Sequence, residues 1–311
     1  YYDRYTREEE KLVSYKEKGG FYRHIYSLPC RWRRAKYHDK VVRAYQQGFD
    51  APVLLNDSEV IVSLTTFPPR ISQLHLVLKS ILWQTYIPAN IIVWLSEQEF
   101  PGRLNDLPEE LRKLTANGVK FKFVPENFRS HKKYYYVFRE YPDHKVITVD
   151  DDLIYPRNTI ERLLSLSYQY PDTVCGNVIR KIRMDGNTFS VYRKWPKVFM
   201  MPVNSSLQNV AIGCGGIYYP SRWYGEELFD WKIISEHCPS ADDLWLKANE
   251  LKRRINVTGG GEFYPRPIEL PQTQNNSLQK KNNGKINLND KQWKSLNELW
   301  KLDELYCING K

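Results

Sequence analysis

Several features that would place this chain in a common class are absent. Its five cysteines are scattered, with neither the spacing of metal ligands nor the pattern of a disulfide framework, so neither a cysteine-ligated zinc site nor a disulfide-stapled fold is indicated. No apolar run approaches the ~20 residues that a membrane-spanning helix needs. Scattered cysteines suit a reducing compartment, and we therefore expect a cytoplasmic protein. Because the chain begins with Tyr1 rather than Met, the missing signal peptide excludes nothing.

The motifs of several enzyme classes are also missing. The sequence has no glycine fingerprint for a dinucleotide and no P-loop, which argues against a Rossmann dehydrogenase and a P-loop kinase. No Gly-x-Ser-x-Gly elbow occurs, and the six histidines include no His-x-x-x-His pair. A serine hydrolase and a zinc hydrolase are therefore not indicated, and we assign no catalytic histidine.

Acidic residues are scarce near the N-terminus. Residues 11–49 contain ten Lys or Arg against only Glu17 and Asp39, and the whole chain has a net charge of +10. Residues 31–34 (Arg-Trp-Arg-Arg) combine charge with an aromatic ring, which suits peripheral contact with an anionic membrane at its inner face. A solvated helix surface explains the same pattern equally well. The cationic density is too low for a nucleic-acid arm, and we expect no nucleic-acid partner.

The sequence does contain a regular alternation of strand and helix patterns. Apolar, β-branched runs predict strands, and apolar residues three and four apart predict the helices between them. This alternation predicts an α/β fold, a three-layer sandwich with a mostly parallel central sheet. Before residue 150 the predicted strands are 60–64, 91–95, 119–124 and 145–149, and the predicted helices are 72–84, 107–117 and 132–141.

Composition divides the chain into three parts. Residues 1–55 predict a helical, basic N-terminal appendage, and residues 56–270 predict the α/β domain. Residues 271–311 predict a tail rich in Gln, Asn and Lys, followed by an amphipathic helix at 290–305. The other elements predicted in the α/β domain are helices at 158–168 and 240–254, strands at 174–182 and 189–192, and a glycine-rich turn with a short strand at 211–219.

Three consecutive aspartates, Asp150, Asp151 and Asp152, follow the apolar strand at 145–149. A run that is apolar on both faces is typical of a buried central strand, and three adjacent carboxylates must leave such a core, meet a cation or shift their pKa values. Side chains at i and i+2 of a strand share a face, so Asp150 and Asp152 are predicted to converge on one divalent cation. The alternative is an acidic surface turn.

Other polar residues are predicted at the same edge of the sheet. Thr65, Thr66 and Arg70 follow the first strand, where α/β sheets commonly bind a nucleotide. A connection stiffened by two prolines explains these residues equally well. Lys133 begins a helix at this edge and could meet a diphosphate, but we expect at least one of Lys132 and Lys133 to be an exposed cation.

Two further segments suggest the border of a binding site. Residues 213–216 (Gly-Cys-Gly-Gly) permit a close approach of backbone to a ligand, or a tight structural turn. Asp242 and Asp243 follow Ser240, a good N-cap, and acids in a first helical turn complement the helix dipole. Either aspartate could also be a general base that takes a proton from an acceptor hydroxyl. One helix start can serve both roles.

The order of these motifs resembles that of GT-A-fold glycosyltransferases over about residues 59–265. The similarity is closest to bacterial enzymes that build surface polysaccharides or lipopolysaccharide. The matching segments are residues 63–70 (SLTTFPPR), 80–85 (SILWQT) with the strand 91–95, 149–152 (VDDD, like the Asp-x-Asp motif), 213–216 (GCGG, like the glycine loop at the acceptor site) and 241–245 (ADDLW, like the acidic motif that holds the base of inverting members).

The resemblance implies a Rossmann-like GT-A fold and a metal-dependent, inverting transfer of a sugar from a nucleotide sugar, most often a UDP-sugar. The acceptor would be a hydroxyl of a glycan or a lipid-linked glycan. Asp152 and Asp150 would hold Mn²⁺ or Mg²⁺, and Asp243, with Asp242 as second choice, would be the base. The pair Asp242–Asp243 replaces a more usual Glu-Asp, which leaves the choice of base open. The residues expected to contact the donor are Thr65, Thr66, Arg70, Lys133, Asp150, Asp151, Gly215 and Gly216.

Two other functions fit parts of the sequence. A nucleotidyltransferase acting on sugar phosphates uses a similar sheet and similar carboxylate chemistry, but residues 65–70 lack the glycines usual in its first loop. A non-catalytic carbohydrate-binding protein would account for the 9 Trp, 22 Tyr and 12 Phe, because aromatic rings stack on sugars. Release of pyrophosphate would identify the first, and glycan binding without donor hydrolysis the second.

Overall fold

The centre of the protein is an eight-stranded mixed sheet. The computed structural model describes residues 2–18, 27–47, 52–54, 59–198, 203–220, 222, 224–259, 264–270 and 287–307. Neighbouring pairs β1–β2, β1–β4, β2–β3 and β6–β14 are parallel, whereas β13 and β11 run the other way. Across the sheet the strands are β11 (Val203–Ser206), β14 (Asn256–Gly259), β6 (Thr173–Gly176), β13 (Ile217–Pro220), β4 (Lys145–Thr148), β1 (Val60–Thr65), β2 (Asn90–Ser96) and β3 (Val119–Val124).

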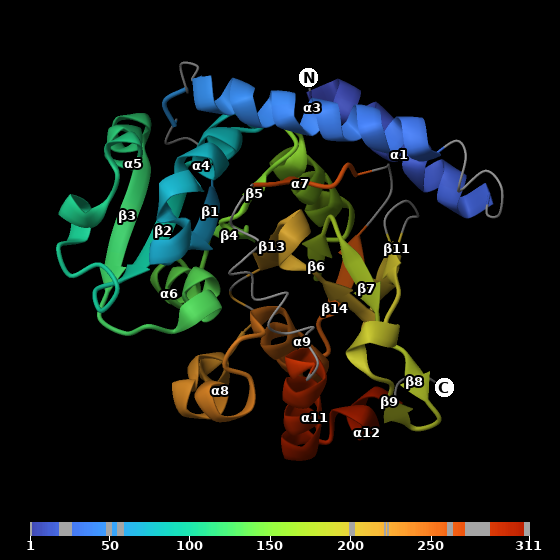
Figure 1. Cartoon of the computed structure of the whole chain (residues 1–311). Helices are drawn as coiled ribbons and strands as arrows, with labels where there is room; N and C mark the ends of the chain where they lie inside the picture. The colour runs from blue at the N-terminus through green and yellow to red at the C-terminus, as the bar shows by residue number, and fades with distance from the viewer. Residues whose placement is uncertain are drawn as a thin grey trace.

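Helices cover both faces of this sheet (Figure 1). Strand β1 shows why, because its side chains alternate between two buried apolar clusters: Ile61 belongs to the one that includes α6 and α9, and Val60 and Val62 to the one that includes α4 and α7. The predicted three-layer, Rossmann-like α/β sandwich is therefore confirmed. The covering helices are α4 (Leu74–Leu82), α5 (Glu109–Lys113), α6 (Lys132–Glu140), α7 (Thr159–Gln169), α8 (Trp231–His237) and α9 (Asp242–Arg253).

Two N-terminal helices, α1 (Tyr2–Lys18) and α3 (Ser27–Gln47), pack against each other across one end of the sandwich (Figure 1). Glu8 pairs with Arg33 at 3.0 Å and Glu9 with Arg34 at 2.7 Å, which joins the two helices. The helical prediction for this region is confirmed. Within the described part of the chain, no helix combines the length and apolarity needed to cross a lipid bilayer.

Small strand pairs complete the walls of the fold. A three-stranded sheet contains β10 (Lys197–Val198), β7 (Ile179–Lys181) and β12 (Asn209–Ala211), and a hairpin contains β8 (Met184–Asp185) and β9 (Thr188–Phe189). Strand β5 (Leu153–Ile154), directly after the three aspartates, pairs with β15 (Ile268–Glu269). This last pair brings the segment around residue 266 beside the aspartate loop, although more than a hundred residues separate them.

Three predicted boundaries are wrong for identifiable reasons. The helix expected from Ser72 begins at Leu74, because Pro68–Gln73 form a 3₁₀ turn with proline at its start. The strand expected at 174–182 is two strands, β6 and β7, which belong to different sheets. The C-terminal amphipathic helix is two helices, α11 (Leu288–Trp300) and α12 (Leu302–Cys307), because Lys301 between them is left-handed with φ 52°. Residues 271–286 of the predicted tail lie outside the described residues.

Candidate functional site

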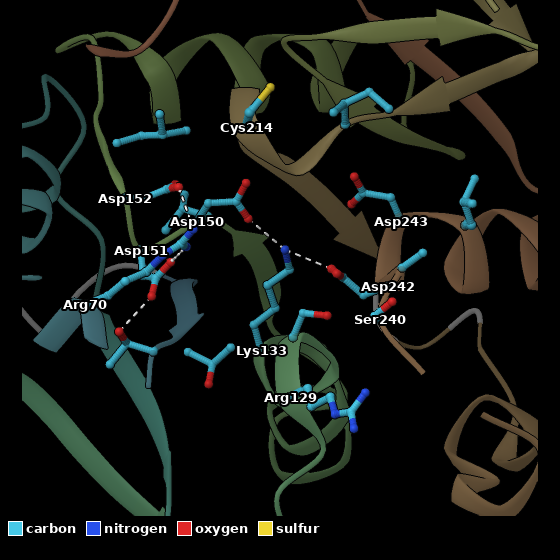
Figure 2. A pocket seen from close by; sticks show the side chains of 18 of the residues that line it. Arg70, Arg129, Lys133, Asp150, Asp151, Asp152, Cys214, Ser240, Asp242 and Asp243 are labelled. Atoms are coloured by element: carbon cyan, nitrogen blue, oxygen red, sulfur yellow. Dashed lines mark hydrogen bonds and ion pairs between the residues drawn. The ribbon is translucent and has the colours of Figure 1, made fainter. Parts of the chain in front are cut away.

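A cavity of about 730 Å³ lies where β1 and β4 end, at the carboxyl edge of the parallel strands. This is the edge at which open α/β sheets bind ligands. Figure 2 shows Asp150, Asp151 and Asp152 on one side of the cavity and Asp242 and Asp243 on the other, with Lys133 between them. The predicted site residues that line it are Thr65, Thr66, Arg70, Lys133, Asp150, Asp151, Asp152, Asp242 and Asp243.

The aspartate loop is held by Arg70. Strand β4 is fully buried from Val146 onward, and it ends at Thr148, two residues before the first aspartate. The guanidinium of Arg70 forms an ion pair with Asp151, and its Nη2 lies 2.9 Å from Asp152 Oδ2. Thr66 Oγ1 donates a hydrogen bond of 2.7 Å to Asp151 Oδ2. The loop after β1 is therefore the partner of the loop after β4, which joins two predicted segments of the site.

Lys133 connects the two sides of the cavity. Its ammonium lies 2.9 Å from Asp150 Oδ1 and 2.8 Å from Asp242 Oδ2. Burial alone would lower the pKa of Lys133, but the charges of Asp150 and Asp242 outweigh that effect and raise it well above its usual value. Lys133 is therefore a permanent cation between the aspartate loop and helix α9. The expectation that Lys132 or Lys133 is exposed is wrong, because Lys132 is also buried, against Glu99 at 3.3 Å.

The aspartate loop carries more negative charge than its cations neutralise. Burial raises the pKa of Asp152 to about 7; Arg70 opposes the shift, and the neighbouring charges of Asp151 and Asp150 add to it. Of the pair predicted to bind metal, Asp150 has a side chain 31% exposed and Asp152 one 12% exposed. An added cation would relieve this repulsion.

The donor set at this loop fits a hard divalent cation. Carboxylate oxygens are the ligands that Mg²⁺ and Mn²⁺ prefer, and those of Asp150 and Asp152 border a cavity with room for phosphate oxygens as further ligands. Among the residues that the structure describes, no group of three or more His, Cys, Asp or Glu side chains is arranged to bind a metal by itself. The ligand would therefore have to complete the coordination.

Helix α9 presents its first turn to the opposite side of the cavity. The prediction that Ser240 caps this helix is wrong: Ala241 takes the N-cap position, and the Ser240 hydroxyl donates instead to Gln292 Oε1 at 3.3 Å. Asp243 Oδ2 accepts a hydrogen bond of 3.1 Å from the backbone N–H of Gly213. Its other oxygen, Oδ1, is buried and has no hydrogen-bond partner among the residues that the structure describes, and such an atom can accept a proton from a ligand hydroxyl.

The environments of Asp242 and Asp243 separate their pKa values. Burial raises the pKa of Asp243 to about 8, and the charge of Asp242 adds to the shift. Asp242 is also buried, but the ion pair with Lys133 dominates and lowers its pKa. Two adjacent carboxylates of which one remains ionised and the other titrates near neutral pH are a common arrangement for acid–base chemistry. Asp243 is therefore the better candidate for a base.

The glycine loop supports the site from behind. A Cβ atom at Gly213 would lie 3.0 Å from Asp150 Oδ1 and 3.1 Å from Lys133 Nζ, so any side chain there would press on that ion pair. Gly216 has φ +78°, which favours glycine. Gly215 and Gly216, predicted to contact a donor, do not line the cavity; Gly215 packs against Val178, and Gly216 faces Thr159 and Leu163.

Sequence reasoning did not find several residues that line the cavity. Glu99 and Asn127 line the cavity together with Lys132, whose Nζ lies 3.1 Å from Asn127 Oδ1. Arg180, Tyr192, Lys197 and Arg266 line the cavity as well. They come from segments that are separate in sequence and that carry no recognisable motif. The pairing of β7 with β10 and of β15 with β5 brings Arg180, Lys197 and Arg266 to the site.

No protein-family profile matches the sequence, and no curated protein matches it either. Among solved structures, a TarS fragment (1–349) from S. aureus in complex with UDP is 15% identical and has a TM-score of 0.40, covering 66% of this chain and 59% of that one. The mannosyltransferase PcManGT from Pyrobaculum calidifontis, in complex with GDP-Man and Mn²⁺, is 12% identical with a TM-score of 0.41, covering 73% of this chain and 62% of that one.

A CMP:2-keto-3-deoxy-manno-octonic acid synthetase complexed with CTP is 12% identical with a TM-score of 0.38, covering 70% of this chain and 95% of that one. This chain thus spans less than two thirds of the length of TarS (1–349) and of PcManGT. Of these three, PcManGT is a mannosyltransferase. With TM-scores below 0.5, these likenesses carry no argument about function.

Proposed function

We propose that this protein is a metal-dependent glycosyltransferase that moves a sugar from a nucleotide sugar, such as a UDP-sugar, to a hydroxyl of a glycan or lipid-linked glycan. One observation carries the proposal. A single cavity has an aspartate loop at the end of a buried central strand on one side, and on the other a half-buried carboxylate, Asp243, whose Oδ1 is buried and receives no hydrogen bond from any described residue. The first suits a metal-bound diphosphate and the second an acceptor hydroxyl.

Each side of the cavity has its own role in this mechanism. Asp150 and Asp152 would hold Mn²⁺ or Mg²⁺, with Arg70 and Thr66 fixing the loop that carries them. When bound, the divalent ion neutralises charge on the departing nucleoside diphosphate. Thr65, Thr66 and Arg70 would border the nucleotide, and Lys133 would hold Asp150 in place while adding positive charge beside the diphosphate.

Asp243 would activate the acceptor. Its Oδ1 would take the proton of the acceptor hydroxyl as the hydroxyl oxygen bonds to the anomeric carbon and the nucleoside diphosphate leaves with the bonding electrons. Because the base and the aspartate loop lie on opposite sides of the cavity, attack from the side opposite the leaving group is favoured, which predicts inversion (Figure 2). Asp242 would remain ionised against Lys133 and keep helix α9 in register with the aspartate loop.

Donor binding gives the first test of this function. At 100 times its dissociation constant a ligand stabilises a protein by about 2.7 kcal/mol, enough to raise Tm by several degrees. We expect UDP-sugars to raise Tm when Mn²⁺ is present and much less with EDTA, and we expect the assay with acceptor to release nucleoside diphosphate. Pyrophosphate release would instead identify a nucleotidyltransferase, and glycan binding with no donor effect a carbohydrate-binding protein.

We also propose peripheral contact of helix α3 with an anionic membrane surface. Leu28 and Trp32, one helical turn apart, are 63% and 67% exposed, and the ammonium of Lys36 lies 5.4 Å from the Trp32 ring centroid. Exposed apolar and aromatic side chains beside cations are typical of a membrane interface.

Vesicle sedimentation measures this contact. The change of both Leu28 and Trp32 to Ser should weaken partitioning to phosphatidylglycerol vesicles at least about tenfold, since two apolar side chains no longer insert. The variant Trp83→Ser removes an exposed tryptophan elsewhere, 38% exposed, and should bind as the wild type does. Equal binding to neutral phosphatidylcholine vesicles, or no loss in the double variant, would contradict the proposal.

A further inference from the structure

A cluster of cations lines the part of the cavity that the proposed mechanism does not use. Arg180 comes from β7, Lys197 from β10, and Arg266 from the segment before β15. Glu269 adds a carboxylate to the wall of the cavity. Three positive side chains from three separate segments meet at one surface, which requires a reason because like charges repel.

The pairing of β7 with β10 makes the repulsion direct. In this antiparallel ladder Lys197 stands opposite Arg180, and residues in opposite positions share a face with their Cβ atoms about 4.5–5.5 Å apart. Two cations in such positions destabilise a sheet. Within the described part of the chain, neither Arg180 nor Lys197 forms an ion pair with a carboxylate. A bound anion would turn this unfavourable pair into a favourable one.

The guanidinium of Arg180 is fixed in place but not fully satisfied. Its Nη1 donates to the backbone oxygen of Trp195 at 2.5 Å, and the group lies over the ring of Tyr192, 4.6 Å from its centroid. Its Nε is buried and forms no hydrogen bond with any residue in the described ranges. A planar guanidinium held this way is prepared for a tetrahedral oxyanion, to which it can donate in parallel.

The three cations act on one another. The side chain of Lys197 still reaches solvent, yet lost hydration in the cavity wall, together with the charges of Arg180 and Arg266, lowers its pKa. Arg266 also forms an ion pair with Glu9 of α1, with its Nε 3.6 Å from Glu9 Oε1. The cluster thus joins two strands of the small sheet to a segment that the N-terminal helices contact.

The position of Tyr192 relates this cluster to the proposed base. Tyr192 lines the cavity, and the guanidinium of Arg180 lies over its ring. Burial raises the pKa of Tyr192, Arg180 opposes that shift, and the charge of Asp243 adds to it. Arg180 and Asp243 therefore border the same part of the cavity. The loop after β1, with Thr66 and Arg70, already contains its own cation, which is paired with the aspartate loop.

We propose that Arg180, Lys197 and Arg266 form a subsite for a phosphate group on the acceptor, so that the acceptor is a phosphate-bearing glycan or a glycan carried on a lipid phosphate. This inference rests on the proposed transferase function. A phosphate suits the site better than a carboxylate because it offers more oxygens and more charge to three cationic side chains. The diphosphate of the donor is the other source of the same chemistry, since Leu270 N–H bonds to Asp152 O and keeps this segment near the aspartate loop.

Calorimetric titration of glycerol phosphate, at constant ionic strength, separates the two sources. The protein is first saturated with UDP and Mn²⁺, which occupies the donor subsite. Glycerol phosphate should still bind, and Arg180→Gln and Lys197→Gln should each weaken it by about tenfold or more, as expected for a lost charged hydrogen bond. Lys181→Gln is the matched control, because Lys181 follows Arg180 in β7, points to the other face and does not line the cavity.

Each other outcome has one meaning. If UDP displaces glycerol phosphate, and the Arg180 and Lys197 variants lose UDP affinity, the cluster serves the donor diphosphate and the proposal is overturned. Equal binding of glycerate would assign a carboxylate instead, and absence of binding would remove the subsite. If UDP itself does not bind, but glycerol phosphate binds in an Arg180-dependent way, the transferase function fails while the phosphate subsite stands.

Discussion

Replacing Asp243 with Asn is expected to slow sugar transfer by about 10²–10⁴-fold while the affinity for the donor stays near that of the wild type. The amide can still accept the hydrogen bond from the Gly213 backbone N–H, so the helix start keeps its geometry. It cannot accept a proton, so the acceptor hydroxyl loses its base. Turnover is measured by nucleoside diphosphate release, and donor affinity by calorimetry.

The pH dependence of the reaction checks the same assignment. Since burial and Asp242 raise the pKa of Asp243 to about 8, its ionised form grows as pH rises, and kcat/KM should climb to a plateau above about pH 8. The sign for stability is opposite. The folded protein holds this proton more tightly than an unfolded chain with a pKa of 3.8, so stability declines as pH rises from about 4 towards 8. Asp243→Asn should lose both dependences.

A control carboxylate makes the result interpretable. Asp185 lies outside the cavity and pairs with Lys194 at 3.1 Å on an exposed hairpin. Asp185→Asn should leave turnover and its pH profile unchanged. If Asp243→Asn keeps wild-type turnover, or if it loses donor affinity while still catalysing transfer, then Asp243 is not the base and Asp242 becomes the residue to examine.

Replacing Asp152 with Asn should lower transfer by about 10³-fold or more with little change in folding. A bound divalent ion stabilises the charge that develops on the leaving group in the transition state by several kcal/mol, and the loss of that stabilisation corresponds to the expected fall in rate. Arg70 would still pair with Asp151, so the loop keeps its anchor. The rise in Tm that UDP gives with Mn²⁺ should disappear in this variant.

Asp151→Asn provides the contrast. Asp151 is 5% exposed and binds both Arg70 and Thr66, so its loss should weaken the loop and lower Tm without removing the response to Mn²⁺. Normal turnover in Asp152→Asn would refute the metal assignment to Asp152 and Asp150. The assignment would also be refuted if the rise in Tm with UDP and Mn²⁺ were lost in Asp151→Asn but kept in Asp152→Asn.

The α/β architecture was predictable because the central strands carry apolar side chains on both faces. Val146 and Ile147 are apolar in positions that face opposite sides of the sheet, and only a strand covered on both faces explains that. The aspartates stood out against such a strand. The ion pairs could not be predicted from the pattern, because Arg70 and Asp151 are far apart in sequence. The prediction that Asp150 and Asp152 share one strand face assumed that the strand continues through them, whereas β4 ends at Thr148.

The other side of the cavity could be predicted only in part. Asp242 and Asp243 were identified through their place at a helix start, but which of them carries a high pKa depends on Lys133, whose reach across the cavity no local rule reveals. Arg180 and Lys197 are single cations in ordinary surroundings along the chain. Their meeting is a result of strand pairing in a small sheet, and short strands give weak sequence signals.

The N-terminal helices have a consequence for any attempt to shorten this protein. Glu9 of α1 contacts Arg266, and the His38 ring of α3 donates to the backbone oxygen of Glu269 at 2.9 Å. Both helices therefore hold the segment of residues 266–269, which lines the cavity. Removal of the first fifty residues would remove these contacts to residues 266–269. The basic N-terminal helices thus help to shape the cavity.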